Sequence, residues 1–88
     1  MLDNVKENLR IRHSALDSEV ADTIGAARSD LERVGVRWSD FDPLILQAVK
    51  LYCRWSFNFE NQADRYLRAY EDLRDSMSLD STRRQADV

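Results

Sequence analysis

The sequence predicts an all-α domain, a compact bundle of about four helices. Two glycines and one proline are few breaks for 88 residues, and they stand between segments whose apolar residues recur at spacings of three and four. A composition that is 43% hydrophobic and 33% charged is typical of one small folded domain and not of a disordered chain. We therefore expect a single domain over residues 1–79 and a flexible polar tail over residues 80–88.

A short helix and a long helix are predicted before Gly35. We expect the short helix over residues 1–11, with one apolar stripe: Leu2, Val5 and Leu9. Ser14 is expected to be the N-cap of the long helix, which should end at Val34. Its apolar stripe has spacings of four, four, three, four and three: Leu16, Val20, Ile24, Ala27, Leu31 and Val34. Gly35 can then adopt the left-handed conformation that commonly follows a helix.

A third and a fourth helix are predicted after a loop over residues 36–41. Asp42 should cap the third helix and Pro43 should begin it, because proline suits the first helical position. Apolar residues cover more than one face of the third helix, so we expect it to be central. The fourth helix follows residues 58–62 and carries a polar ladder of Asp64, Arg68 and Asp72. The expected core is Leu16, Val20, Ile24, Leu31, Ile45, Ala48, Tyr52, Tyr66, Tyr70 and Leu73.

The reactive residue types do not form a pattern typical of a catalytic, metal or cofactor site. His13 is the only histidine, and Ser14 beside it has no third group to orient a catalytic pair. Cys53 is the only cysteine and lies in the crowded third helix, so we expect an inert buried thiol. Asp40 and Asp42 are sufficiently explained by a turn and a helix cap. We expect no enzyme activity, no cofactor and no metal.

Charge and hydropathy argue against nucleic-acid and membrane binding. The net charge of -3 is opposite to what neutralisation of DNA phosphates requires. A helix-turn-helix would need a tight turn, whereas residues 35–41 form a longer connection, and its recognition helix would open with the acidic and apolar residues 42–46. No apolar run reaches the length of a signal peptide or a membrane span, so we expect an intracellular protein.

Four segments, in their order and spacing, resemble one protein family. They are LDNVKENLRI (residues 2–11), AARSDLERVGV (26–36), DPLILQAVKLY (42–52), and YLRAYEDL followed by SMSL (66–79). Together they resemble the head-tail connector, or head-tail adaptor, proteins of long-tailed bacteriophages, often described as phage DNA-packaging proteins. The resemblance extends from Leu2 to Leu79. Many members have a glycine-containing turn near residues 58–62, where this chain has no glycine.

The resemblance implies a structural protein of the virion neck that is assembled in the host cytoplasm. Copies would form a homo-oligomeric ring of about a dozen subunits beneath the portal protein, in which each subunit uses two different faces. The ring would extend the DNA channel, let DNA pass without specific binding, and present a surface to the next head-completion or tail adaptor protein. The alternative function is a small helical protein-protein interaction module or dimeric regulator of bacterial origin.

Two segments are candidate contact sites in such a connector. The loop carries large amphipathic side chains that would contact a neighbouring protomer or the lumen: Arg37, Trp38, Asp40 and Phe41. The other interpretation is that these aromatics pack onto their own core. The C-terminal segment would dock on the portal through Leu79, Arg83 and Arg84, or else be disordered.

Overall fold

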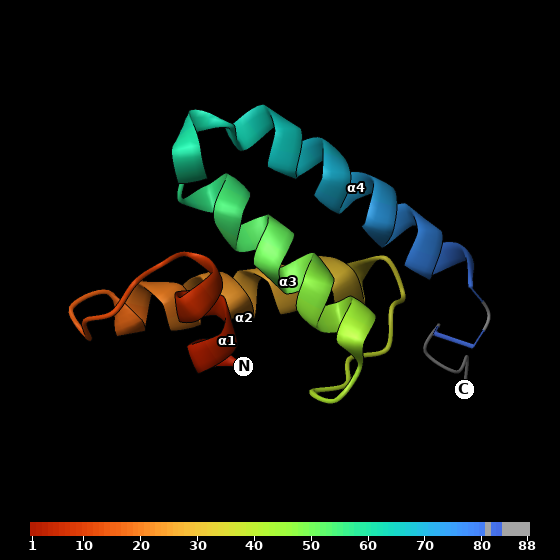
Figure 1. Cartoon of the computed structure of the whole chain (residues 1–88). Helices are drawn as coiled ribbons and strands as arrows, with labels where there is room; N and C mark the ends of the chain where they lie inside the picture. The colour runs from red at the N-terminus through yellow and green to blue at the C-terminus, as the bar shows by residue number, and fades with distance from the viewer. Residues whose placement is uncertain (81, 84–88) are drawn as a thin grey trace.

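The computed structural model describes residues 1–80 and 82–83 and confirms the all-α fold. Within these residues α3 lies between α2 and α4, and α1 lies across α2 and α3 (Figure 1). Both long neighbours therefore use α3 as their common packing surface, as its many-sided apolar pattern predicts. The elements are α1 (Leu2–Asn8), α2 (Asp17–Arg33), α3 (Pro43–Ser56), the 3-10 turn η1 (Phe59–Asn61) and α4 (Ala63–Leu79).

None of the helices among the described residues is both long enough and apolar enough to cross a membrane.

The end of α2 confirms the predicted role of Gly35. Gly35 has a φ of 87°, and its N–H donates to the carbonyl of Glu32 at 3.0 Å. The N–H of Val36 donates to the carbonyl of Leu31, also at 3.0 Å, which completes a Schellman motif. The side chains of Leu31 and Val36 are both fully buried, so the motif turns the chain while keeping an apolar contact.

The start of α3 is also as predicted. Asp42 is the N-cap, and its Oδ1 accepts a hydrogen bond of 2.9 Å from the N–H of Leu44. Pro43 occupies the first helical position, where its lack of an N–H removes no helical hydrogen bond.

The predicted boundaries between α1 and α2 are wrong: α1 ends at Asn8 and not at Ile11, and the N-cap of α2 is Leu16 and not Ser14. The first helix ends at Asn8, because Arg10 adopts the left-handed conformation with a φ of 60° and reverses the chain. Ser14 does not cap α2, which begins at Asp17 and has no side-chain cap. Instead the carbonyl of Ser14 accepts a hydrogen bond from the N–H of Asp17 in a turn, and Asp17 pairs with Lys6 of α1 at 2.6 Å. The turn at Arg10 and the ion pair between Lys6 and Asp17 thus hold α1 against α2.

The core joins all four α-helices. The sequence pattern places four further residues in the core that are only half-buried, although each packs against it: Leu16, Ile24, Tyr52 and Leu73. A domain of this size has a large surface relative to its volume, so few of its apolar side chains can be fully buried. The buried apolar residues are Val5, Leu9, Val20, Ala27, Leu31, Val36, Ile45, Ala48, Val49, Cys53, Tyr66, Tyr70 and Met77.

The turn between α3 and α4 reverses the chain without glycine. Asn58, Glu60 and Asn61 all have positive φ, of 49°, 54° and 59°. Asparagine tolerates this conformation better than most residues, and Oδ1 of Asn58 also accepts a hydrogen bond of 3.3 Å from the N–H of Ala63 at the start of α4. Two asparagines and Glu60 thus make a turn that contains no glycine.

Candidate functional site: the loop–tail surface and the α1–α3 hollow

Trp38 of the α2–α3 loop packs onto its own domain. Its ring is half-buried against the core, and its Nε1 donates to Oδ1 of Asp40 at 2.8 Å. The guanidinium of Arg28 on α2 lies 5.1 Å from the ring centroid, within the range of a cation–π contact. For Trp38, therefore, the structure agrees with the interpretation that the loop aromatics pack onto the core.

Phe41, in the same loop, points away from the core. Its side chain is 94% exposed, and Leu79 at the end of α4 is 84% exposed. Burying one such side chain contributes about 1.5–3 kcal/mol, so a partner that covered both would gain appreciable free energy. Large exposed apolar side chains of this kind often mark protein-protein contacts.

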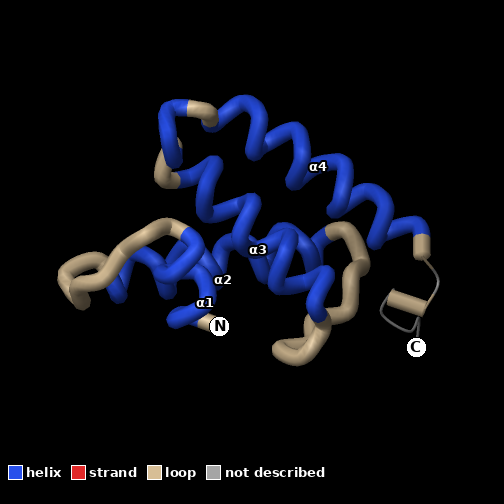
Figure 2. The backbone as a smooth tube through the Cα atoms, in the orientation of Figure 1, coloured by secondary structure: helices blue, strands red, loops and turns tan. Residues whose placement is uncertain are grey.

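The loop and the C-terminal segment, which are far apart in the sequence, lie side by side (Figure 2). The backbone N–H of Arg37 donates to the carbonyl of Arg83 at 2.7 Å, and Nη2 of Arg37 donates to the carbonyl of Thr82 at 3.1 Å. Arg83 in turn forms an ion pair with Asp42, the cap of α3. The structure thus unites the two candidate segments in one loop–tail surface, which we define as residues 37–42, 79–80 and 82–83.

A turn at the end of α4 directs the C-terminal segment toward the loop. Oδ1 of Asp80 accepts hydrogen bonds from the hydroxyl of Thr82 at 2.7 Å and from its N–H at 3.0 Å. These bonds, together with the charge of Arg83 at 3.5 Å, lower the pKa of Asp80 below its ordinary value. Asp80 is therefore ionised at neutral pH and holds the turn. Arg84, the remaining candidate residue, lies outside the described residues, and the flexibility expected over residues 80–88 stays a prediction.

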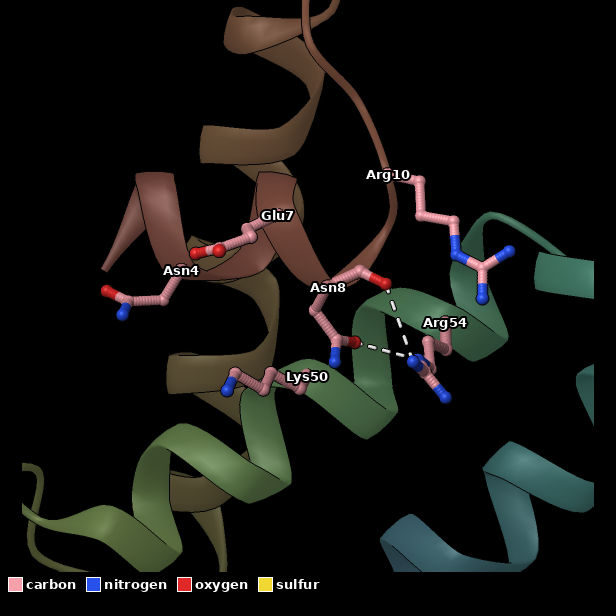
Figure 3. Close-up of a pocket in the computed structure, with 6 residues that line it drawn as sticks. All are labelled: Asn4, Glu7, Asn8, Arg10, Lys50 and Arg54. Carbon is pink, nitrogen blue, oxygen red and sulfur yellow. Dashed lines mark hydrogen bonds between the residues drawn. The ribbon is translucent and has the colours of Figure 1, made fainter.

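A second feature is a hollow between α1 and α3, which was not predicted (Figure 3). Arg54 lines it from α3: Nε donates to Oδ1 of Asn8 at 2.7 Å, and the guanidinium lies 4.7 Å from the centroid of Phe59. The spacing of Lys50 and Arg54 indicated only a solvated edge of the third helix, because the approach of α1 cannot be read from either segment alone. The hollow has a volume of about 370 Å³ and is lined by Asn4, Glu7, Asn8, Arg10, Lys50 and Arg54.

Cys53 and His13 lie in different environments. Cys53 is fully buried in α3, and burial raises the pKa of its thiol to about 12, so the thiol stays protonated at neutral pH. His13 is exposed in the connection between α1 and α2, where its Nδ1 accepts a hydrogen bond of 3.3 Å from the N–H of Ala15. Cys53 thus has the inert role that its position in the third helix predicts.

Comparison with known proteins identifies the family. The family model for phage connector proteins matches residues 1–84, a range that includes every helix and the described part of the loop–tail surface. Neither the curated proteins nor the solved structures contain a match to the chain. The match extends over far more than half of the 88 residues and confirms the family that the helix order and spacing suggested. The chain therefore belongs to the phage connector protein family.

Proposed function

We propose that copies of this connector form a ring beneath the portal protein at the capsid vertex. The ring extends the DNA channel and joins the head to the next head-completion or tail adaptor protein, in the virion neck. The observation that carries the proposal is the match to the phage connector family over residues 1–84. The role is structural: subunits bind one another and their neighbours, and no reaction is part of it.

The loop–tail surface is the part of the molecule best suited to dock on the portal. It carries Phe41 and Leu79, two of the most exposed large apolar side chains in the described structure. The same surface carries the charged side chains of Arg37, Asp40 and Arg83, which can form hydrogen bonds. Exposed apolar side chains combined with polar groups are typical of protein-protein interfaces.

The charge of the chain suits a channel through which DNA slides. The net charge is -3, and a ring of such subunits would repel the duplex at long range instead of holding it. Weak, non-specific contact with DNA is what a conduit requires, because tight binding would slow passage of the genome.

Solution mass and portal binding test the proposal. Light scattering over a range of concentrations, followed by negative-stain imaging, should reveal a closed ring either of the free protein or after mixing with the cognate portal. A stable dimer that does not bind the portal would overturn the proposal and favour the alternative function, a dimeric regulator of bacterial origin.

Substitutions on the loop–tail surface test where the portal binds. Phe41→Ser combined with Leu79→Ser should weaken portal binding and leave the free energy of unfolding nearly unchanged, because both side chains are already exposed. Arg68→Ser on the exposed face of α4 is the matched control and should bind the portal like the wild type. Equal portal binding by all three proteins would remove the docking role of this surface.

A further inference from the structure

The hollow between α1 and α3 is rich in hydrogen-bond donors and positive charge. Lys50 and Arg10 on its sides form no ion pair among residues 1–80 and 82–83, and Glu7 is its only acid. Oδ1 of Asn8 already accepts from Arg54, which leaves the amide N–H groups of Asn8 to donate into the hollow. Such a set of groups is complementary to carboxylates.

The N-terminal half of α2 carries the opposite charge. Residues 14–27 contain three acids and no lysine or arginine. Asp17 is paired with Lys6, whereas Glu19 and Asp22 are exposed and have no ion-pair partner in the part of the chain that the structure describes. Their exposed neighbours on this helix face are small, so a second molecule can approach the two carboxylates closely: Ser18, Ala21, Gly25 and Ala26.

The exposed surface of α2 around Glu19 and Asp22, which we call the acidic face, lies on the other side of the molecule from the hollow. In Figure 3 the hollow faces the viewer, and α2 passes behind α1 and α3. The buried side of α2, with Val20, Ala27 and Leu31, faces those two helices. With about 100° of rotation per residue, Asp22 lies nearly opposite this side and Glu19 lies at the edge of the exposed face. Two complementary surfaces on opposite sides of one chain favour a head-to-tail contact, which closes into a ring by rotation, over a symmetric dimer.

We propose that the hollow between α1 and α3 binds Glu19 and Asp22 of a neighbouring copy of this chain. The inference rests on the proposed ring and identifies the two faces through which its subunits meet. Lys50 and Arg10 pair with the incoming carboxylates, and the Asn8 amide donates to them. A DNA phosphate is a poorer occupant, because the hollow contains the carboxylate of Glu7 and belongs to an acidic chain, and both repel phosphates.

Charge reversal tests the pairing. Lys50→Glu with Arg10→Glu alters the hollow, and Glu19→Lys with Asp22→Lys alters the acidic face. Each pair of substitutions should lower the association constant between copies by roughly 10-fold, measured by light scattering for the free protein and for the protein mixed with the portal. The chain with all four changes should recover most of the association, since its two faces are complementary again. Arg65→Glu with Arg68→Glu is the control, because it makes the same charge change on exposed residues of α4 and should leave association unaltered.

A zero-length carbodiimide cross-link tests the same contact in the wild-type protein. The reagent joins an amine to a carboxylate in direct contact, so Lys50 should become linked to Glu19 or Asp22 of another copy. Mass spectrometry of a mixture of light and isotopically heavy chains shows whether the linked peptides come from different molecules. This measurement needs no variant to fold.

The outcomes separate the inference from the proposed function. The inference fails and the ring stands in either of two cases. In the first, copies assemble but Lys50 is not linked to α2 of a neighbour. In the second, copies of the chain with all four substitutions associate as weakly as those of each double variant. If the wild type does not assemble alone or on the portal, both fail. If the hollow variant loses binding to a labelled DNA duplex while association between copies is unchanged, the hollow is a phosphate site and the inference is wrong.

Discussion

The hydroxyl of Tyr70 on α4 donates a hydrogen bond of 2.6 Å to Oδ2 of Asp30 on α2, which links the two helices that pack on either side of α3. Arg74 reaches the same oxygen at 3.1 Å, and Arg33 donates to Oδ1 at 2.6 Å. Partial burial by itself raises the pKa of Asp30, but the bonds from Tyr70, Arg33 and Arg74 outweigh it, so the pKa is lowered. Asp30 is therefore the ionised centre of a network that joins α2 to α4.

Tyr70→Phe should lower the free energy of unfolding by about 1–2 kcal/mol, because it removes a hydrogen bond to a charged and partly buried acceptor. Urea denaturation followed by circular dichroism measures the change. Tyr52→Phe is the control: the Tyr52 hydroxyl makes no hydrogen bond within the described residues, so we expect a change below about 0.5 kcal/mol. Equal effects of the two substitutions would show that the Asp30 contact adds no stability.

The lowered pKa of Asp30 predicts a specific acid sensitivity. A carboxylate whose pKa is lower in the folded state stabilises the fold fully above its unfolded pKa, and this contribution is lost as the pH falls through the folded value. The stability difference between the wild type and Asp30→Asn should therefore be constant above about pH 5 and shrink below the ordinary pKa of 3.8. Urea midpoints measured between pH 7 and pH 2 test this, and a difference that stays constant to the lowest pH would contradict it.

Glu60→Gly should raise the free energy of unfolding by about 0.5–1 kcal/mol. Glu60 has a φ of 54°, and a side chain with a Cβ is strained there, whereas glycine is not. Glutamate is also exposed at this position, so no packing is lost. Glu60→Ala keeps the Cβ and should give no increase. Thermal unfolding of the three proteins measures the order, and a less stable glycine variant would rule out strain at this turn.

Asp42 has two roles that single substitutions can separate. Asp42→Ala removes both the cap of α3 and the ion pair with Arg83, and should cost about 1–2 kcal/mol of stability. Arg83→Ala keeps the cap and removes the ion pairs of Arg83 with Asp42 and Asp80, which are partly exposed, and should cost less than about 1 kcal/mol. Hydrogen exchange at the Leu44 amide should accelerate in the first variant alone. Faster exchange in both would mean that the C-terminal segment, and not the cap, holds the start of α3.

Cys53 should be unreactive in the folded protein. Its thiol is fully buried, and with a pKa of about 12 almost none of it is thiolate at pH 8. A chromogenic disulfide reagent should label Cys53 only as fast as the domain opens, and at once in urea. Rapid labelling without denaturant would show that α3 is less well covered than the structure indicates.

The local signals of the sequence determined most helix ends correctly. Gly35 and the Asp42-Pro43 pair act through their own backbone and immediate neighbours, so their effects are visible without knowledge of the fold. The same reasoning failed at Ser14: α2 begins at Asp17, which pairs with Lys6 of another helix, a contact that neighbouring residues in the sequence do not reveal. Arg10 carried no turn signal either, because arginine rarely adopts a positive φ.

The sequence by itself determined the four helices, because periodicity and caps depend only on residues close together in the chain. The order and spacing of its segments also carried the resemblance to the connector family, which the family match confirms. Only the tertiary structure decided which charges meet. The packing of α1 on α3 places Arg10 and Lys50 around one hollow, and the return of α4 places Arg83 on Asp42, 41 residues away. Such pairings depend on distances between helices, and spacing along a sequence holds no information about those distances until the core has packed.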